Sequence, residues 1–180
     1  MAADGTVESG LNLAIALRVR DLLAFAGVDT VMTRSDDAAI YDEGSATLRE
    51  KKVSDLKNRA ELVNATENAV LLSIHQNSLP SSPATHGAQV FFNGAEGAAP
   101  LAGSVQDALN LAVNTEKAKQ PTAIGASVYL MKHITAPGVL VECGFLTNEN
   151  EAAQLKSEAY QLRLAAAITA GLLTWNGSAA

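Results

Sequence analysis

The sequence predicts an α/β domain in which a central sheet is covered by helices on both faces. Segments typical of strands alternate along the chain with segments whose apolar residues recur at helical spacing. The strand-like segments are too continuously apolar to face water on one side, which favours a mostly parallel sheet. The chain has 180 residues, of which 48% are apolar and 18% charged, and it shows no repeat or linker. This composition fits one globular domain.

The first half of the chain is expected to hold two helices and two strands. Apolar residues recur at helical spacing over 11–26, and Gly27 follows as a C-cap. Ser54 is the candidate N-cap of the second helix. The elements expected are a helix over 11–26, a β-branched strand over 28–33, a polar surface loop over 34–52, a helix over 54–66 and a buried strand over 69–74.

The second half continues the alternation. A loop over 76–86 contains two prolines and separates the buried strand from the next one. The elements expected after it are a strand over 88–92, a helix over 98–113, strands over 127–131 and 138–143, and helices over 149–155 and 159–175. The sheet is therefore expected to have about five strands from this chain.

Charge and composition exclude several classes of partner. The formal net charge is -6, whereas nucleic-acid-binding proteins usually present a basic face, so no nucleic acid is expected. No window approaches the roughly 18 consecutive apolar residues that span a bilayer. Residues 1–8 carry neither a basic stretch nor an apolar stretch, so no signal peptide is expected in this chain.

Three polar residues stand where an apolar element meets a loop, and they are the candidates for chemistry: Glu8, His75 and Glu142. His75 directly follows the apolar run 70–74, so its imidazole is expected at a strand end, where open α/β sheets place their ligands. Glu142 lies within the apolar strand 138–143, where burial would raise its pKa and suit it to general acid/base work. Glu8 lies just ahead of the first helix.

Each candidate also has an explanation without chemistry. A carboxylate at a helix start, such as Glu8, is favoured by the helix dipole. A single histidine at a strand end, such as His75, is often satisfied by backbone groups. Glu142 is the hardest to explain in this way, because an unpartnered carboxylate inside an apolar strand is costly. The residue types alone leave both explanations open for Glu8 and His75.

Four short segments resemble, in order and spacing, the motifs of the zinc-dependent N-acetylmuramoyl-L-alanine amidases (amidase type 3). These segments are VESGLNLA from Val7, MTR from Met32, SIHQNS from Ser73 and VECGFLTN from Val141. The resemblance covers essentially the whole chain. It is strongest to the sporulation branch, which prepares the spore cortex, because of VYLMKH from Val128 and the cysteine after Glu142. It implies a mixed, mostly parallel sheet in a phosphorylase/hydrolase-like three-layer sandwich.

The resemblance implies a role for each of the three candidates. In such enzymes the residues at the positions of Glu8 and His75 bind a zinc ion, and the glutamate at the position of Glu142 is the catalytic acid/base. Zinc polarises the scissile carbonyl and lowers the pKa of a bound water, whose proton Glu142 would pass to the leaving amine. Arg34 and Asn77 also match motif positions, but the resemblance assigns them no role.

One motif of the family is not found. Its members begin with a strand that ends in Asp-Pro-Gly-His-Gly-Gly, whose histidine is the third zinc ligand, and nothing before Glu8 matches it. We therefore expect residues 1–180 to be a single amidase domain shortened at its N-terminus, without the first strand and one zinc ligand. His86 is expected in a loop and His133 at the rim of the cleft, rather than as replacements. Cys143 is expected in the core, on the other face of its strand.

The predicted function is zinc-dependent hydrolysis of the amide bond between N-acetylmuramic acid and L-alanine in peptidoglycan. The alternative is a catalytically impaired homologue that binds peptidoglycan or a protein partner. A hydrolase with a side-chain nucleophile is disfavoured, because Ser73 and Cys143 have no evident base beside them. The resemblance implies action outside the cytoplasm, in the cell wall or forespore envelope, and allows for an activating protein partner.

Overall fold

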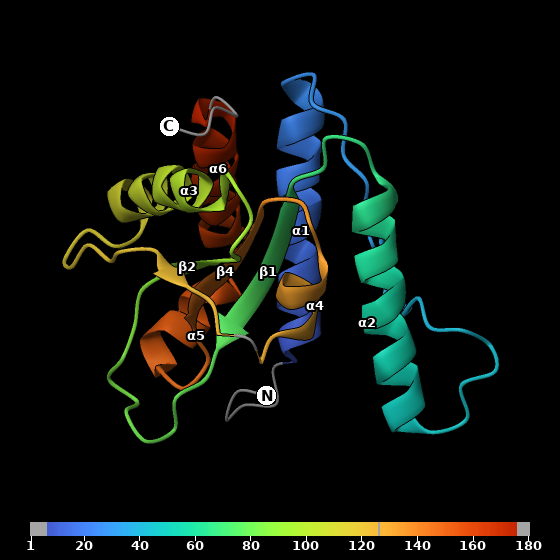
Figure 1. Cartoon of the computed structure of the whole chain (residues 1–180). Coiled ribbons are helices and arrows are strands. Elements are labelled where there is room, and N and C mark those ends of the chain that lie inside the picture. Colours follow the sequence, from blue (N-terminus) through green and yellow to red (C-terminus); the bar gives the residue numbers. More distant parts are fainter. Residues whose placement is uncertain (1–6, 126, 176–180) are drawn as a thin grey trace.

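The computed structural model describes residues 7–125 and 127–175, and it confirms an α/β fold with helices on both faces of a mixed sheet (Figure 1). Within those residues the elements are α1 (Glu8–Phe25), α2 (Leu48–Ala65), β1 (Leu71–Asn77), β2 (Gln89–Phe92), α3 (Ala98–Ala112), β3 (Thr122–Ala123), α4 (Tyr129–His133), β4 (Gly138–Phe145), α5 (Glu149–Leu155) and α6 (Glu158–Thr174). None of the helices in this part of the chain is long and apolar enough to cross a membrane.

The sheet has the strand order β1-β4-β2-β3. Strands β1 and β4 pair in parallel, β4 and β2 pair antiparallel, and β2 and β3 pair in parallel. In the described part of the chain nothing pairs with the outer edge of β1. Strand β4 therefore lies inside the sheet, which explains why its residues Val139 and Val141 are fully buried.

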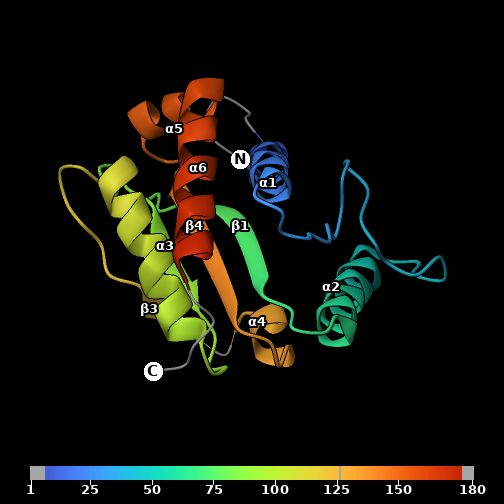
Figure 2. The same ribbon diagram turned by 90° about the horizontal axis from the view of Figure 1, so that it is seen from above.

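Helices α1, α3 and α6 cover one face of the sheet, and α4 covers the other (Figures 1 and 2). Figure 2 shows β1 between α1 and α4, with α2 further out. The larger core lies under the three long helices and includes Ile15, Leu101 and Ile168. The smaller core joins α2 and α4 to the sheet through Val63, Met131 and other residues.

The alternation of side chains along β1 and β4 decides which residues share the α4 face. Val139, Val141 and Cys143 belong to the larger core, whereas Leu140 belongs to the smaller one. Because successive residues of a strand point to opposite faces, Glu142 shares the face of Leu140. By the same alternation His75 lies on the α4 face, since Ile74 enters the larger core. The prediction that Cys143 is a core residue is confirmed.

Two of the expected strands are wrong. Residues 28–33 form no regular element, since none of the described strands pairs with this β-branched run, and Val28 and Val31 are exposed. The segment 127–131 runs into the short helix α4, whose Met131 is buried against the sheet. The two-residue strand β3 was not predicted, because two exposed residues show no periodicity. The described sheet therefore has four strands instead of five.

Several boundaries also differ from those expected. The N-cap of helix α2 is Thr47, seven residues before the predicted N-cap Ser54, because Thr47 and Glu50 form a capping box. Strand β1 continues past His75 to Asn77, so the histidine lies within the strand rather than just beyond it. Helix α1 starts at Glu8 itself. The expectation about the family's first strand concerns the start of the chain, where residues 1–6 lie outside the described residues.

A close approach between α3 and α6 supplies a stability prediction. A Cβ atom added at Gly171 of α6 would lie 2.5 Å from the Cα of Val105 in α3. We expect Gly171→Ala to lower the free energy of unfolding by about 1–3 kcal/mol, because two backbones must separate. Gly103→Ala is the matched control: nothing lies within 4 Å of the added Cβ, and alanine favours a helix by up to about 1 kcal/mol. Urea unfolding of both variants measures the difference, and equal effects would contradict it.

Candidate active site

The three residues singled out in the sequence lie close together, although α1, which carries Glu8, packs on the other face of the sheet from α4. His75 of β1 is in register with Glu142 of β4, so the two side chains are neighbours on paired strands. The carboxylate of Glu8, in the first turn of α1, reaches the same point, with its Oε1 3.1 Å from His75 Nδ1. The structure thus brings together two carboxylates and one imidazole from distant parts of the chain.

The Glu8 carboxylate is held by several hydrogen-bond donors. The backbone N–H of Gln76 and the side-chain amide of Asn12 donate to Oε1, at 3.2 Å and 3.0 Å. The hydrogen bond with His75 is the largest of several contributions that lower the pKa of Glu8 to about 2. Glu8 is therefore a fixed carboxylate anion at neutral pH, which is the form that a cation requires.

Asn12 and Gln76, for which the sequence predicted no role, complete this arrangement. Gln76 is 4% exposed, and its side-chain amide donates to Asn12 Oδ1 at 3.2 Å. Asn12 follows Glu8 by one helical turn, so an i,i+4 pair of polar residues on an apolar helix was the signal available. Gln76 gave no such signal, because its contact with Asn12 depends on how α1 docks on β1.

Arg34 and Asn77, the two other motif residues, act on the surroundings of the site. Arg34 donates to the backbone oxygen of Ser9 at 2.6 Å, and so ties the loop before α2 to the first turn of α1. The backbone oxygen of Asn77 accepts from Leu146 N at 2.8 Å, which joins the ends of β1 and β4. Both contacts fix the segments that carry the candidate residues.

Glu142 differs from Glu8 in its electrostatic environment. Its Oε2 is buried and has no hydrogen-bond partner among the described residues. Burial is the main cause that raises the pKa of Glu142 to about 6, and the negative charge of Glu8 adds to the rise while His75 opposes it. A carboxyl group with a pKa near 6 can both accept and donate a proton close to neutral pH.

Glu8 and His75 lie close enough together for one metal ion to contact both. A tetrahedral zinc ion with bonds of about 2.0–2.2 Å would keep its ligand atoms about 3.3–3.6 Å apart, slightly more than the 3.1 Å hydrogen-bond distance between Glu8 Oε1 and His75 Nδ1. Among the described residues no third His, Cys, Asp or Glu completes a metal-binding group. His86 is an exposed loop residue that contacts Ala84 O, and His133 stacks on Tyr129, so neither faces this pair.

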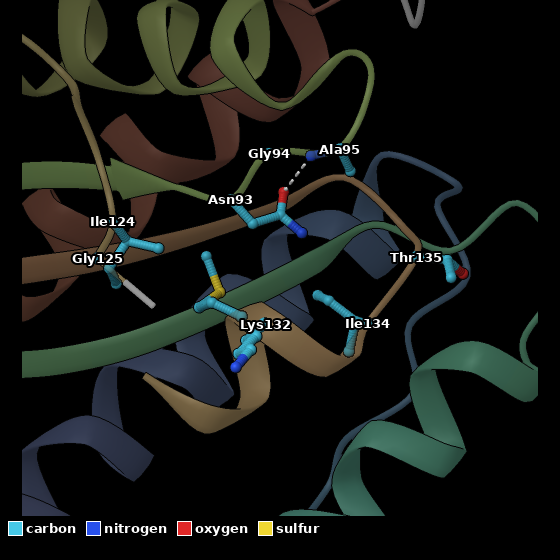
Figure 3. Close-up of a pocket in the computed structure, with 9 residues that line it drawn as sticks. Asn93, Gly94, Ala95, Ile124, Gly125, Lys132, Ile134 and Thr135 are labelled. Carbon is cyan, nitrogen blue, oxygen red and sulfur yellow. Dashed lines mark hydrogen bonds between the residues drawn. The ribbon is translucent and has the colours of Figure 1, made fainter. Parts of the chain in front are cut away.

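A pocket elsewhere on the molecule is separate from these residues. Its volume is about 470 Å³, and Figure 3 shows the residues that line it. The pocket lies beside Gly138, at the start of β4, whereas Glu142 lies four residues further along that strand. The amide of Asn93 in its wall is bonded to backbone groups of Ala136 and Gly138. Its lining residues are Asn93, Gly94, Ala95, Ile124, Gly125, Met131, Lys132, Ile134 and Thr135.

Comparison with known proteins identifies the family. Residues 1–174 match the family described as N-acetylmuramoyl-L-alanine amidase. The chain belongs to this amidase family. Over 173 residues it is 39% identical to the germination-specific N-acetylmuramoyl-L-alanine amidase of Bacillus subtilis (strain 168), covering 94% of this chain and 70% of that protein.

Solved structures of amidases have the same fold. The CwlD amidase of Clostridioides difficile, solved in complex with the GerS lipoprotein, superposes with a TM-score of 0.91 at 33% identity, covering 97% of this chain and 89% of that one. An N-acetylmuramoyl-L-alanine amidase of Clostridium difficile 630 gives a TM-score of 0.81 at 28% identity, with 97% and 87% covered. The amidase class and the relation to germination and sporulation amidases predicted from the sequence are confirmed.

The raised pKa of Glu142 predicts a pH-dependent difference in stability for Glu142→Gln in metal-free protein. The folded-state pKa of about 6 exceeds the usual 4.5, so ionisation of Glu142 opposes folding, and its penalty grows as the pH rises from 4.5 through 6. Relative to the variant, the wild type should lose about 2 kcal/mol of unfolding free energy over this range. Denaturant unfolding at pH 4 and pH 8 measures it, and a pH-independent difference would contradict the raised pKa.

Proposed function

We propose that this amidase hydrolyses the bond between the lactyl carbonyl of N-acetylmuramic acid and L-alanine in peptidoglycan, with a zinc ion held by Glu8 and His75. The observation that carries the proposal is the buried, unpartnered Oε2 of Glu142. Glu142 is in register with His75 on the neighbouring strand. Glu142 is partly protonated near neutral pH, which suits an acid/base. Glu8 is anionic and His75 carries an imidazole, which suits both of them as metal ligands.

The residues have distinct tasks in this mechanism. Zinc, when bound, would polarise the scissile carbonyl and acidify a water. Glu8 supplies an oxygen ligand that stays anionic, since its pKa is lowered to about 2. His75 supplies a nitrogen ligand, held beside Glu8 by the docking of α1 on β1. Asn12 and the backbone of Gln76 orient the Glu8 carboxylate, as outer hydrogen bonds do at many metal sites.

Glu142 carries the proton in both directions. Ionised, it accepts a proton from the attacking water as the C–O bond forms at the lactyl carbonyl. Protonated, it donates that proton to the nitrogen of L-alanine as the C–N bond breaks, which leaves a free carboxylate on the muramic acid side and a free amine on the peptide. A pKa of about 6 suits both steps near neutral pH.

The relatives indicate where this activity is used. One is named germination-specific and another was solved with a lipoprotein bound. We propose a role in spore-cortex peptidoglycan, outside the cytoplasm, with a protein partner of the same kind. A catalytically impaired homologue that only binds peptidoglycan is the rival, but Glu8, His75 and Glu142 are all present and lie together.

Replacing Glu142 should separate zinc binding from catalysis. In the chain preceded by a strand with Asp-Pro-Gly-His-Gly-Gly, which adds the expected third ligand, we expect Glu142→Gln to lower kcat by at least about a hundredfold, the lower range for a general acid/base, because an amide cannot take up the proton. Zinc content should be unchanged, since Glu142 is not a proposed ligand. Release of free L-alanine amino termini from purified peptidoglycan and atomic absorption measure the two quantities. Normal activity in the variant would remove Glu142 from this role.

The number of ligands predicts weak zinc binding. Catalytic zinc usually takes three protein ligands and a water, and the described residues supply two. We expect the chain of residues 1–180 to bind zinc weakly, and the same chain preceded by a strand with Asp-Pro-Gly-His-Gly-Gly to gain zinc affinity and activity together. The same added segment with alanine for histidine is the control. Full zinc occupancy with strong activity in the 180-residue chain would contradict the need for a third ligand.

A further inference from the structure

Strand β4 contains one extra residue directly after Glu142. His75 is in register with Glu142, but two residues later Asn77 is in register with Phe145, three residues beyond Glu142. Residues 143–144 of β4 therefore bulge opposite a single residue of β1. Bulges turn the side chains beside them and are common next to active sites. Whatever holds this bulge also sets the direction of the Glu142 carboxyl group.

A buried carboxylate, Glu151, holds the bulge. Its Oε2 accepts the backbone N–H of Phe145 at 2.7 Å, at the end of the bulge. Its Oε1 accepts the backbone N–H of Gly87 at 2.8 Å. Glu151 is 5% exposed and lies in the first turn of α5, whose N-cap Asn148 accepts from Glu151 N at 3.0 Å. The side chain thus joins β4 to the segment before β2, beyond the point where the antiparallel pairing of these two strands begins at Gln89 and Glu142.

The space for this carboxylate exists only because residue 144 is glycine. A Cβ at Gly144 would lie 2.7 Å from Cδ of Glu151 and 2.9 Å from its Oε1. Such a contact would have to push the carboxylate away from the two N–H groups that it binds. Gly144 and Glu151 therefore form a matched pair inside the bulge.

The backbone of Gly87, in the second segment, is hydrogen-bonded to two side chains of opposite charge. Gly87 N–H donates to Glu151, and Gly87 O accepts from the ammonium group of Lys119 at 2.7 Å. The same ammonium lies 5.0 Å from the ring centroid of Phe145. Gly87 lies near the end of the loop between β1 and β2. Glu151 therefore connects the last residue of β4 with the loop that follows β1.

We propose that Glu151 is a positioning residue for the amidase reaction, which fixes the bulge and thereby directs the Glu142 carboxyl group toward the site at His75. This role rests on the proposed function of Glu142 as acid/base. A carboxylate suits it because both oxygens accept, one for each backbone N–H. A glutamine has one acceptor oxygen, and its NH₂ group would face a second donor, so one of the two contacts must open.

The first test compares Glu151→Gln with Glu149→Gln, an exposed glutamate of the same helix. We expect Glu151→Gln to lower kcat about tenfold or more, because a small misdirection of a catalytic group is costly. KM and the zinc dissociation constant should stay within about twofold, since neither Glu8 nor His75 is moved. Glu149→Gln should change none of the three. Unchanged kcat in Glu151→Gln, or a loss explained by unfolding or by weaker zinc binding, would overturn the proposal.

The second test uses the Gly144 contact. Gly144→Ala alone should lower kcat as Glu151→Gln does, because the added methyl displaces the carboxylate. In a Glu151→Ala background the same change should have little further effect, since the atoms that it meets are gone. Additive losses in this double-mutant cycle would mean that Gly144 and Glu151 act separately, and would overturn the proposal.

A third measurement does not depend on activity. In metal-free protein, the amide resonances of Phe145 and Gly87 and the carboxyl carbon resonance of Glu142 should all shift in Glu151→Gln and stay in place in Glu149→Gln. An unmoved Glu142 resonance would overturn the positioning role. If neither the wild type nor the same chain preceded by the Asp-Pro-Gly-His-Gly-Gly strand released L-alanine amino termini, the proposed function would fail, and this spectrum would still decide whether Glu151 controls Glu142.

Discussion

The parallel pairing of β1 with β4 is the constraint on which the site depends. It places His75 beside Glu142 on the face that α4 covers. The same pairing forms the middle of the larger core through Ile74 and Val141, under α1 and α6. Apolar residues on one face thus fix the register of polar residues on the other, since a shift by one residue would turn every side chain over.

Two carboxylates in one site behave differently because their surroundings differ. Glu8 has hydrogen-bond donors from Asn12, Gln76 and His75, and its pKa is lowered. Glu142 is buried with one oxygen unpartnered, and its pKa is raised. The charge of Glu8 itself contributes to the raised pKa of Glu142. Separation of the two pKa values lets one group stay anionic while the other exchanges a proton, as the mechanism proposed above requires.

The sequence predicted the parts of this site that local pattern determines. His75 and Glu142 stood out because a polar residue interrupts or ends an apolar run, and such positions meet at one place in a parallel sheet. The strand predicted over residues 28–33 is wrong, since a β-branched run is also compatible with an exposed loop when none of the described strands lies beside it. The short segment around Met131 has apolar residues that fit both the helical spacing and the alternation of a strand. The helix α4 therefore could not be distinguished from a strand.

Other contributors could not be read from the sequence because they depend on tertiary contacts. Gln76 becomes relevant only through the docking of α1, and Glu151 only through the bulge and Gly87. In the sequence Glu151 looks like an ordinary acidic residue in the first turn of a helix. A buried carboxylate with two backbone donors is recognisable only when the fold brings those donors to it.

The contact between Glu8 and His75 joins residues that are 67 positions apart in the chain, and Glu142 is a further 67 positions beyond His75. No single helix or hairpin holds two of these groups. Closing such long loops costs conformational entropy, and this cost precedes the favourable energy of the contacts. The cluster therefore cannot persist in a partly folded chain, and its assembly reports on formation of the whole domain. A loss of ligand binding after mild destabilisation would reflect opening of the fold at large as much as damage to the three residues themselves.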